Sequence, residues 1–132
     1  MNTPIVVEAF AESDPYLTTV VYDGGALNAD EKLISGGQGR GPTPGDLLAA
    51  SLATCTVITL KMYAARKGWA NQAISSKVEV ITDAGETRFI RNIKLDDTLS
   101  FDQRERMLQI AEKCPVHKIL SGSISIQTSL SL

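Results

Sequence analysis

The chain has 132 residues, of which 43% are hydrophobic and 21% are charged, as in ordinary globular domains. This length is enough to bury a hydrophobic core without disulfides or structural metals, so we expect one domain over residues 1–132. The net charge of -2 lacks the basic excess that nucleic-acid binding requires, which excludes DNA and RNA as expected partners.

The first ten residues, "MNTPIVVEAF", carry the acidic Glu8, no basic residue and only a short apolar run. This pattern predicts neither a signal peptide nor a membrane anchor. No window approaches the ~20 apolar residues of a spanning helix, so we expect no membrane partner. We therefore expect a cytoplasmic protein whose two cysteines serve redox chemistry, metal binding or packing rather than permanent cross-links.

The first third of the chain predicts strands followed by a loop. A strand is expected around Ile5–Phe10. The alternating run "YLTTVVYDGGAL", with its "DGG" turn signal, predicts a hairpin from Leu17 into the early thirties. The segment from Gly36 to Gly45 holds five glycines and two prolines, so it is expected to be a loop that leads into a helix.

A long helix is predicted to begin at Thr43. Thr43 supplies a hydroxyl cap, Pro44 suits the first helical position, and Asp46 faces the positive end of the helix dipole. After Asp46, apolar and small residues recur at spacings of three and four with no charge before Lys61, so we expect the helix to be covered nearly all round. A basic turn followed by Gly68 predicts its end.

The second half of the chain predicts a hairpin, a helix and a closing strand. The runs "SSKVEVIT" and "RFIRNIKL" alternate around the turn "DAGE". Ser100 and Gln103 predict the capped start of a helix over Phe101–Lys113. Its expected apolar stripe comprises Met107, Leu108, Ile110 and Ala111. The final "SISIQTSLSL" alternates as a strand, and the order of elements predicts an α+β fold with a mostly antiparallel sheet.

Two cysteines and one histidine are the first candidates for chemistry. Cys55 lies inside the predicted long helix, where a free cysteine is more often a small buried hydrophobe than a reactive thiol. Cys114 precedes Pro115 and occupies the predicted N-cap of a short helix, where free N–H groups and the helix dipole stabilise a thiolate. His117 and Lys118 could add positive charge there. A reactive Cys114 and a packed "CP" corner remain alternatives.

Other uses of these residues are weighed against simpler ones. A zinc site would need four ligands, and the chain offers three Cys and His residues, so a carboxylate would have to complete it. His117 alone is more often a surface or interface histidine than a ligand or base. Arg40, on the glycine-rich loop, could lower a thiol pKa or bind a polar substrate, or it could be a solvated loop arginine. Asp46 is more typical of a helix N-terminus than of a catalytic site.

Two segments, "GPTPGDLLAASLATCTVITLKMYAARKGW" and "KCPVHKILSGSISI", together resemble the OsmC/Ohr family of osmotically inducible and organic-hydroperoxide-resistance proteins. The resemblance covers nearly the whole chain. It rests on a proline-containing loop, a helix with an inner cysteine after an alanine-rich turn, and a "CPV" cysteine followed by a terminal strand. This combination is more specific than either cysteine alone.

The resemblance implies an intertwined α+β homodimer with a long central helix and active sites at the subunit interface. It implies a cysteine-based peroxidase that reduces organic, and also inorganic, hydroperoxides in defence against oxidative stress. Cys55 would attack the peroxide, Cys114 would resolve the resulting sulfenic acid as a disulfide, and a dithiol reductant would restore both thiols. No metal or organic cofactor is implied, and Arg40 and Asp46 are the candidates for the groups that activate the thiol.

One position favours a competing function. Peroxidase branches of the family carry a glutamate ten residues before the first cysteine, and this chain has Gly45 there. The alternative is therefore a non-catalytic protein that binds a small molecule on the same scaffold.

Overall fold

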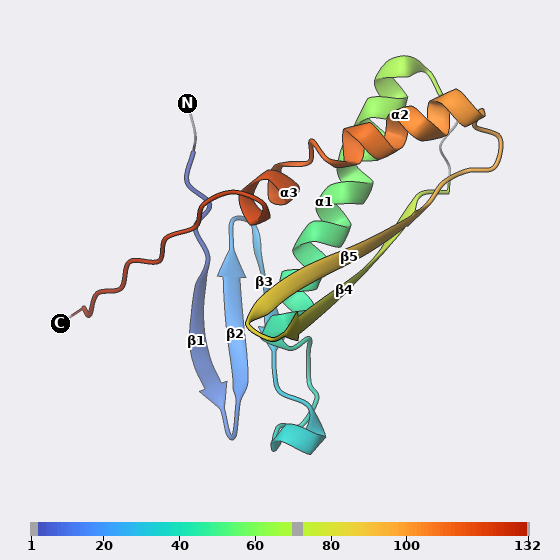
Figure 1. Cartoon of the computed structure of the whole chain (residues 1–132). Coiled ribbons are helices and arrows are strands. Elements are labelled where there is room, and N and C mark those ends of the chain that lie inside the picture. The colour runs from blue at the N-terminus through green and yellow to red at the C-terminus, as the bar shows by residue number, and fades with distance from the viewer. Residues whose placement is uncertain (1–2, 70–72, 132) are drawn as a thin grey trace. The chain divides into compact units, whose positions relative to one another are not determined.

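A computed structural model describes residues 3–69 and 73–131 of the chain. The chain divides into two compact units, Met1–Leu48 and Ala49–Leu132. Both units take part in the long helix α1, Pro44–Lys67, which begins in the first unit and continues through the second (Figure 1). Antiparallel strands and helices make up the chain, so the predicted α+β class is confirmed. The single domain over residues 1–132 stays a prediction.

The N-terminal unit is built on a three-stranded antiparallel sheet. Its strands are β1 (Glu8–Ser13), β2 (Leu17–Tyr22) and β3 (Gly25–Ala29), in the order β1-β2-β3. Tyr22 pairs with Gly25, which leaves a two-residue turn containing Gly24 at a φ of 94°. The predicted hairpin is therefore confirmed, since glycine adopts this φ without steric cost. The first strand begins at Glu8, three residues later than the expected Ile5.

The glycine-rich loop packs closely against the chain that follows β3. It begins after the short 3₁₀ helix η1 (Leu33–Ser35). A Cβ at Gly41 would overlap the backbone of Asn28, and a Cβ at Gly37 would overlap the backbone of Glu31. Backbone hydrogen bonds from Asp30 N–H to the Pro42 carbonyl, 3.1 Å, and from Gly39 N–H to the Glu31 carbonyl, 2.9 Å, hold the two segments together. The glycines thus allow a close approach between backbones.

Local chemistry determines both ends of α1. The Asp46 N–H donates to Thr43 Oγ1 and the Thr43 N–H donates to the Asp46 carboxylate, each over 3.0 Å, so the predicted cap is confirmed and is reciprocal. Pro44 is the first helical residue, where its missing N–H costs nothing. At the other end Gly68 has a φ of 71°, and the helix stops at Lys67 as predicted.

The surface of α1 is less buried than the sequence predicts. Its buried residues are Leu52, Thr56, Leu60 and Ala64, a stripe at four-residue spacing, while Ile58 and Met62 are 54% and 63% exposed. Among the described residues, α1 is also long and apolar enough to cross a membrane by length and composition. The expectation that no segment approaches this composition is therefore wrong. Core helices of soluble proteins have the same composition, so the match is weak support for a membrane span.

The C-terminal unit combines α1 with a hairpin and two further helices. Strands β4 (Ser75–Asp83) and β5 (Glu86–Lys94) pair over their whole length around Ala84 and Gly85, both at positive φ. Helix α2 (Phe101–Ala111) begins with the predicted capping box between Ser100 and Gln103, and α3 (Pro115–Leu120) follows it. These elements appear together in Figure 1, where α2 lies along one end of α1.

The core of this unit joins α1, α2 and the loop before α2. Its buried residues are Leu60, Ala64, Leu99, Met107, Ile110 and Ala111, with Ile93 of β5 packed against them. Three of the four residues of the expected α2 stripe are buried, whereas Leu108 is 51% exposed. Leu108 is therefore outside the buried core of this unit.

The closing strand is the main error of the sequence analysis. Residues 123–131 carry the alternating pattern but form no strand in this chain. Ile124, Ile126 and Leu130 are 60%, 87% and 97% exposed. Alternation identifies a segment able to pair, but a strand also needs an available sheet edge beside it.

Candidate active site

Cys55 lies in the middle of α1, inside the C-terminal unit. It occupies the helix turn after the buried Leu52 and directly precedes the buried Thr56, and it is itself only partly buried. Its Sγ lies 4.0 Å from the hydroxyl of Thr59, one helical turn further on. This free thiol is therefore carried on a rigid element at a partly buried position.

Cys114 is the N-cap of α3, as the sequence predicts. Its Sγ accepts a hydrogen bond from the His117 N–H at 3.3 Å, and Pro115 occupies the first helical position. The side chain is completely buried. This cap orients the sulfur toward the start of α3.

The position of Cys114 at a helix N-terminus does not lower the pKa of its thiol. Burial raises the pKa of Cys114, because desolvation disfavours the thiolate more than its surroundings stabilise it. A hydrogen bond with the Cys55 thiol and the proximity of that thiol raise the pKa further. The His117 N–H and the Arg91 charge oppose this rise without cancelling it. Cys114 is therefore a protonated thiol at neutral pH.

The two cysteines interact although they are distant in sequence. Both are free, and the Cys55 thiol contributes to the raised pKa of the Cys114 thiol. Cys55 is partly buried, whereas Cys114 is fully buried. This difference in burial suits a reaction in which Cys55 is oxidised first and Cys114 then reacts with the oxidised Cys55.

Arg91 on β5 connects the segments that carry both cysteines. Its Nη1 donates to Thr56 Oγ1 at 3.1 Å and to the Ala111 carbonyl at 3.3 Å, and its Nη2 lies 3.0 Å from His117 Nδ1. Thr56 is next to Cys55, and the other two partners lie three residues before and three residues after Cys114. The guanidinium charge acts on the Cys114 thiol.

All of these partners of Arg91 are neutral. In the part of the chain that the structure describes, the only ion pair within 4.0 Å joins Arg40 and Asp30. Arg91 is nonetheless partly buried. The effective dielectric constant is lower there than in water, so its charge acts more strongly on neighbouring groups. Its positive charge therefore remains available to a thiolate or to another anion at the site.

Sequence analysis did not identify Arg91, although a signal was present. In the hairpin register Arg91 pairs with Val78 and lies between Phe89 and Ile93 on the partly buried face of β5. A charged residue at an inward position of an alternating strand needs a buried partner or a function. The pattern "FIRNI" contains this signal, but the position of the arginine relative to the cysteines depends on tertiary packing.

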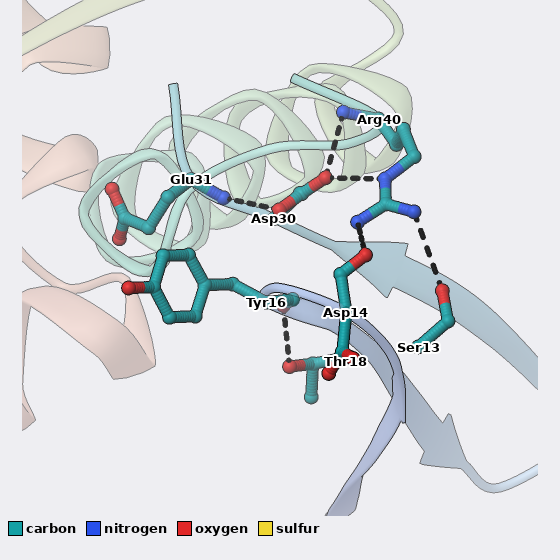
Figure 2. Close-up of polar contacts among 7 residues, drawn as sticks. All are labelled: Ser13, Asp14, Tyr16, Thr18, Asp30, Glu31 and Arg40. Carbon is teal, nitrogen blue, oxygen red and sulfur yellow. Dashed lines mark hydrogen bonds and ion pairs between the residues drawn. The ribbon is translucent and has the colours of Figure 1, made fainter. Parts of the chain in front are cut away.

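Arg40 forms a network inside the N-terminal unit (Figure 2). Its Nε donates to the Asp30 carboxylate at 2.7 Å, and its backbone N–H donates to the same carboxylate oxygen at 3.2 Å. The guanidinium also donates to Ser13 Oγ at 3.3 Å and to the Asp14 carbonyl at 3.2 Å. This bonding joins the glycine-rich loop to the ends of β1 and β3. A role for Arg40 at the thiols stays a prediction.

The Arg40 network also fixes the charge of Asp30. The side chain of Asp30 is fully inaccessible, and its hydrogen bond with Arg40 lowers the pKa of its carboxyl below the usual range. The Glu31 N–H, which donates to Asp30 at 2.8 Å, acts in the same direction. Asp30 is thus a carboxylate at neutral pH, as its pairing with Arg40 requires.

Asp46 has a structural partner as well. Hydrogen bonding with the Thr43 backbone and side chain lowers the pKa of the Asp46 carboxyl, in keeping with its position at the start of α1. A catalytic role for Asp46 stays a prediction.

The zinc alternative gains no structural support. Over residues 3–69 and 73–131, no group of three or more His, Cys, Asp or Glu side chains is arranged to hold a metal ion. Cys55, Cys114 and His117 lie in one region, but the arginine beside them disfavours a cation.

A small open pocket adjoins the Arg91 and His117 side chains. It has a volume of ≈ 220 Å³ and belongs entirely to the C-terminal unit. It is lined by Leu52, Phe89, Arg91, His117, Leu120 and Ser121. Apolar walls around a few polar groups are typical of a small-molecule site.

The fold and the two interacting thiols define an α+β protein with a candidate dithiol site. The chain belongs to the OsmC family, described as OsmC-like protein, whose family model matches residues 37–129. No curated protein sequence matches the chain.

Solved structures show the same fold. A protein from Psychrobacter arcticus has a TM-score of 0.74 at 20% identity, with 90% of each chain covered. An OsmC-like protein from Mycoplasma pneumoniae has a TM-score of 0.73 at 17% identity, with 92% of this chain and 90% of that chain covered. The organic hydroperoxide resistance protein OhrB of Bacillus subtilis has a TM-score of 0.61 at 21% identity, with 89% and 91% covered. The predicted family and its fold are confirmed.

Proposed function

We propose that this protein is a cysteine-based peroxidase that reduces organic hydroperoxides in defence against oxidative stress. The observation that carries the proposal is the electrostatic interaction between the thiol of the partly buried Cys55 and that of the buried Cys114, beside the charge of Arg91. Family membership supports the reaction class, since some structural relatives are described as organic hydroperoxide resistance proteins.

The reaction proceeds in three balanced steps. The Cys55 thiolate attacks one oxygen of the O–O bond of ROOH, which gives Cys55–SOH and, after one proton is taken up, ROH. The Cys114 thiol then attacks the sulfenic sulfur, forming the S–S bond and releasing water. A dithiol reductant exchanges with this disulfide, regenerates both cysteine thiols and becomes a disulfide itself.

The difference between the two thiols supports these assignments. The attacking group must be a thiolate that peroxide can reach, and Cys55 is the more accessible of the pair. The resolving thiol acts only after oxidation, so burial and a raised pKa suit Cys114. Arg91 would stabilise the thiolate and the negative charge that develops on the leaving oxygen.

Titration with cumene hydroperoxide followed by mass spectrometry tests the proposal. One equivalent should consume the peroxide and convert the protein to a Cys55–Cys114 disulfide, and dithiothreitol should sustain turnover. Cys55→Ser should abolish peroxide consumption. Cys114→Ser should consume one equivalent and stop without an intramolecular disulfide. Full turnover by Cys55→Ser would contradict the assignment of the attacking thiol.

The second candidate is a binding protein without peroxide turnover. The pocket of ≈ 220 Å³ beside Arg91 and His117 favours it, because the same lining could hold a small anion with an apolar part. In that case stoichiometric hydroperoxide should leave both thiols reduced, while the apolar carboxylate octanoate should stabilise the protein against thermal unfolding.

A second copy of the chain is the proposed partner, in an intertwined homodimer. Residues 123–131 are exposed and alternate apolar and polar residues without forming a strand, so they can add to the sheet edge of another copy. The exposed Ile58 and Met62 of α1 offer further apolar surface for an interface. Sedimentation equilibrium should give twice the mass of one chain, and removal of residues 123–132 should shift the equilibrium toward monomer.

A further inference from the structure

Among the described hydrogen-bond partners of the Arg91 side chain, His117 is the one with a titratable group. The other two partners are the Thr56 hydroxyl and the Ala111 carbonyl. Arginine has only N–H donors, so at 3.0 Å the Nδ1 atom of His117 must be the acceptor. The ring is therefore neutral in this arrangement and carries its proton on Nε2.

The position of His117 ties this hydrogen bond to the thiol pair. The backbone N–H of His117 donates to the Cys114 Sγ, while its ring accepts from Arg91. Arg91 in turn contacts Thr56, the residue after Cys55. Loss of the ring acceptor would leave the guanidinium without one of its three anchors, at the end that lies nearest α3.

We propose that His117 is a positioning residue whose neutral ring holds the Arg91 guanidinium beside the thiols, and that protonation of the ring releases the arginine and slows thiol reaction. A protonated imidazole offers no acceptor and places a second positive charge 3.0 Å from Arg91. The thiols would therefore react fastest while the ring is neutral and more slowly once it is protonated.

The charged and titratable groups around His117 are few. Arg91 faces it from β5, Cys114 from the N-cap of its own helix, and Cys55 from α1 through Cys114. Lys118 is its exposed neighbour on α3. No carboxylate among the described residues is hydrogen-bonded to the imidazole, so the acid-sensitive contact is the one with Arg91.

The inference rests on the proposed function only where peroxide is the reagent. Alkylation of Cys55 by iodoacetamide requires the thiolate but no peroxidase activity, so it measures the effect of Arg91 independently. The rate should be followed between pH 5.5 and 8 by mass spectrometry of the Cys55 peptide, alongside oxidation by cumene hydroperoxide.

Three variants separate positioning from a structural role. His117→Gln keeps an acceptor that does not titrate in this range, His117→Leu has no acceptor, and Lys118→Gln is a neighbouring control. In the wild type and in Lys118→Gln, the log rate should fall more steeply than one unit per pH unit at the acid end of this range, because ring protonation adds to the loss of thiolate. In His117→Gln the slope should nowhere exceed one, as for the ionisation of a single thiol. At pH 7.5 His117→Leu should react about tenfold more slowly than His117→Gln, the loss expected for one hydrogen bond to a charged group.

Equal slopes in the wild type and in His117→Gln would overturn the inference, even if His117→Leu failed to fold. Circular dichroism checks the fold of each variant. If peroxide leaves the wild type reduced while alkylation shows the predicted slopes, the proposed peroxidase fails and this inference stands. If peroxide oxidises the wild type with unchanged slopes in His117→Gln, the inference fails and the peroxidase stands.

Discussion

Arg40 and Arg91 place the same side chain in two different electrostatic settings. In the N-terminal unit, Arg40 pairs with the inaccessible carboxylate of Asp30 at 2.7 Å and joins three segments of backbone. In the C-terminal unit, Arg91 is held by a hydroxyl, a carbonyl and an imidazole, none of them an anion.

The difference indicates what each arginine can do. A guanidinium already paired with a carboxylate has most of its field compensated, so it serves mainly to hold the loop in place. A guanidinium fixed by neutral groups keeps its charge for whatever anion forms beside it. Here the neighbouring groups are two thiols, which become anionic during the proposed reaction.

The most direct way to break this comparison is Arg91→Met. Loss of a preorganised positive charge beside a reacting anion should slow oxidation of Cys55 by cumene hydroperoxide on the order of 10²-fold. Stopped-flow fluorescence or quenched mass spectrometry measures this rate. Arg88→Met is the matched control, because Arg88 is exposed on the same strand, and it should react within about twofold of the wild type, as surface substitutions usually have small effects.

Arg40→Met tests the other side of the comparison. It leaves the Asp30 carboxylate without its ion-pair partner, so the melting temperature should fall by several degrees while Cys55 oxidation stays close to the wild-type rate. Differential scanning calorimetry and the same kinetic assay measure the two effects. The double variant Asp30→Asn with Arg40→Met should recover part of the lost stability. A loss of rate as large as that of Arg91→Met would instead assign Arg40 to the thiol site.

Acid should weaken the Arg40 network. The Arg40 hydrogen bond lowers the folded-state pKa of Asp30, so its stabilising contribution is present above the unfolded value of about 3.9 and is lost as pH falls through the lowered folded value. Thermal unfolding between pH 2 and 7 should show this decline. Asp30→Asn should be less stable at pH 7 and less sensitive to acid. An unchanged acid dependence in this variant would contradict the account.

Raising the pH into the alkaline range should lower the stability of the C-terminal unit, by less than acid lowers the stability that Asp30 provides. Burial raises the pKa of Cys114 in the folded state, so its contribution to stability is full below the unfolded value of about 8.5 and is lost as pH rises through the raised folded value. Urea unfolding under reducing conditions between pH 7 and 10 measures this loss. Cys114→Ala should lack it, whereas Cys55→Ala should keep the larger part, which comes from burial of Cys114, and lose the part that Cys55 contributes.

Features that depend on neighbouring residues could be predicted from the sequence. The Thr43–Asp46 cap, the Ser100–Gln103 capping box and the turn at Ala84–Gly85 are set by chemistry within a few residues, and all are present. The N-cap position of Cys114 was also predicted from Pro115. The raised pKa of Cys114 could not be predicted in this way, because desolvation by burial outweighs the stabilisation of the thiolate by the His117 N–H at the start of α3.

Features that depend on distant contacts were missed. Residues 123–131 have the local pattern of a strand, but pairing requires an edge that the pattern does not supply. The sequence points to Arg40 rather than Arg91, because Arg40 is the only arginine before Cys55 and lies on the glycine-rich loop that leads into its helix. The contact between β5, α1 and α3 that brings Arg91 to Thr56 and His117 arises only from packing.

Identification of the first thiol to be oxidised tests the central claim most directly. Cys114→Ser and Cys55→Ser, each treated with one equivalent of cumene hydroperoxide and trapped with dimedone, should differ sharply. The account predicts a sulfenic-acid adduct on Cys55 in Cys114→Ser and almost none on Cys114 in Cys55→Ser. Faster adduct formation on Cys114, or no adduct on either cysteine, would contradict it.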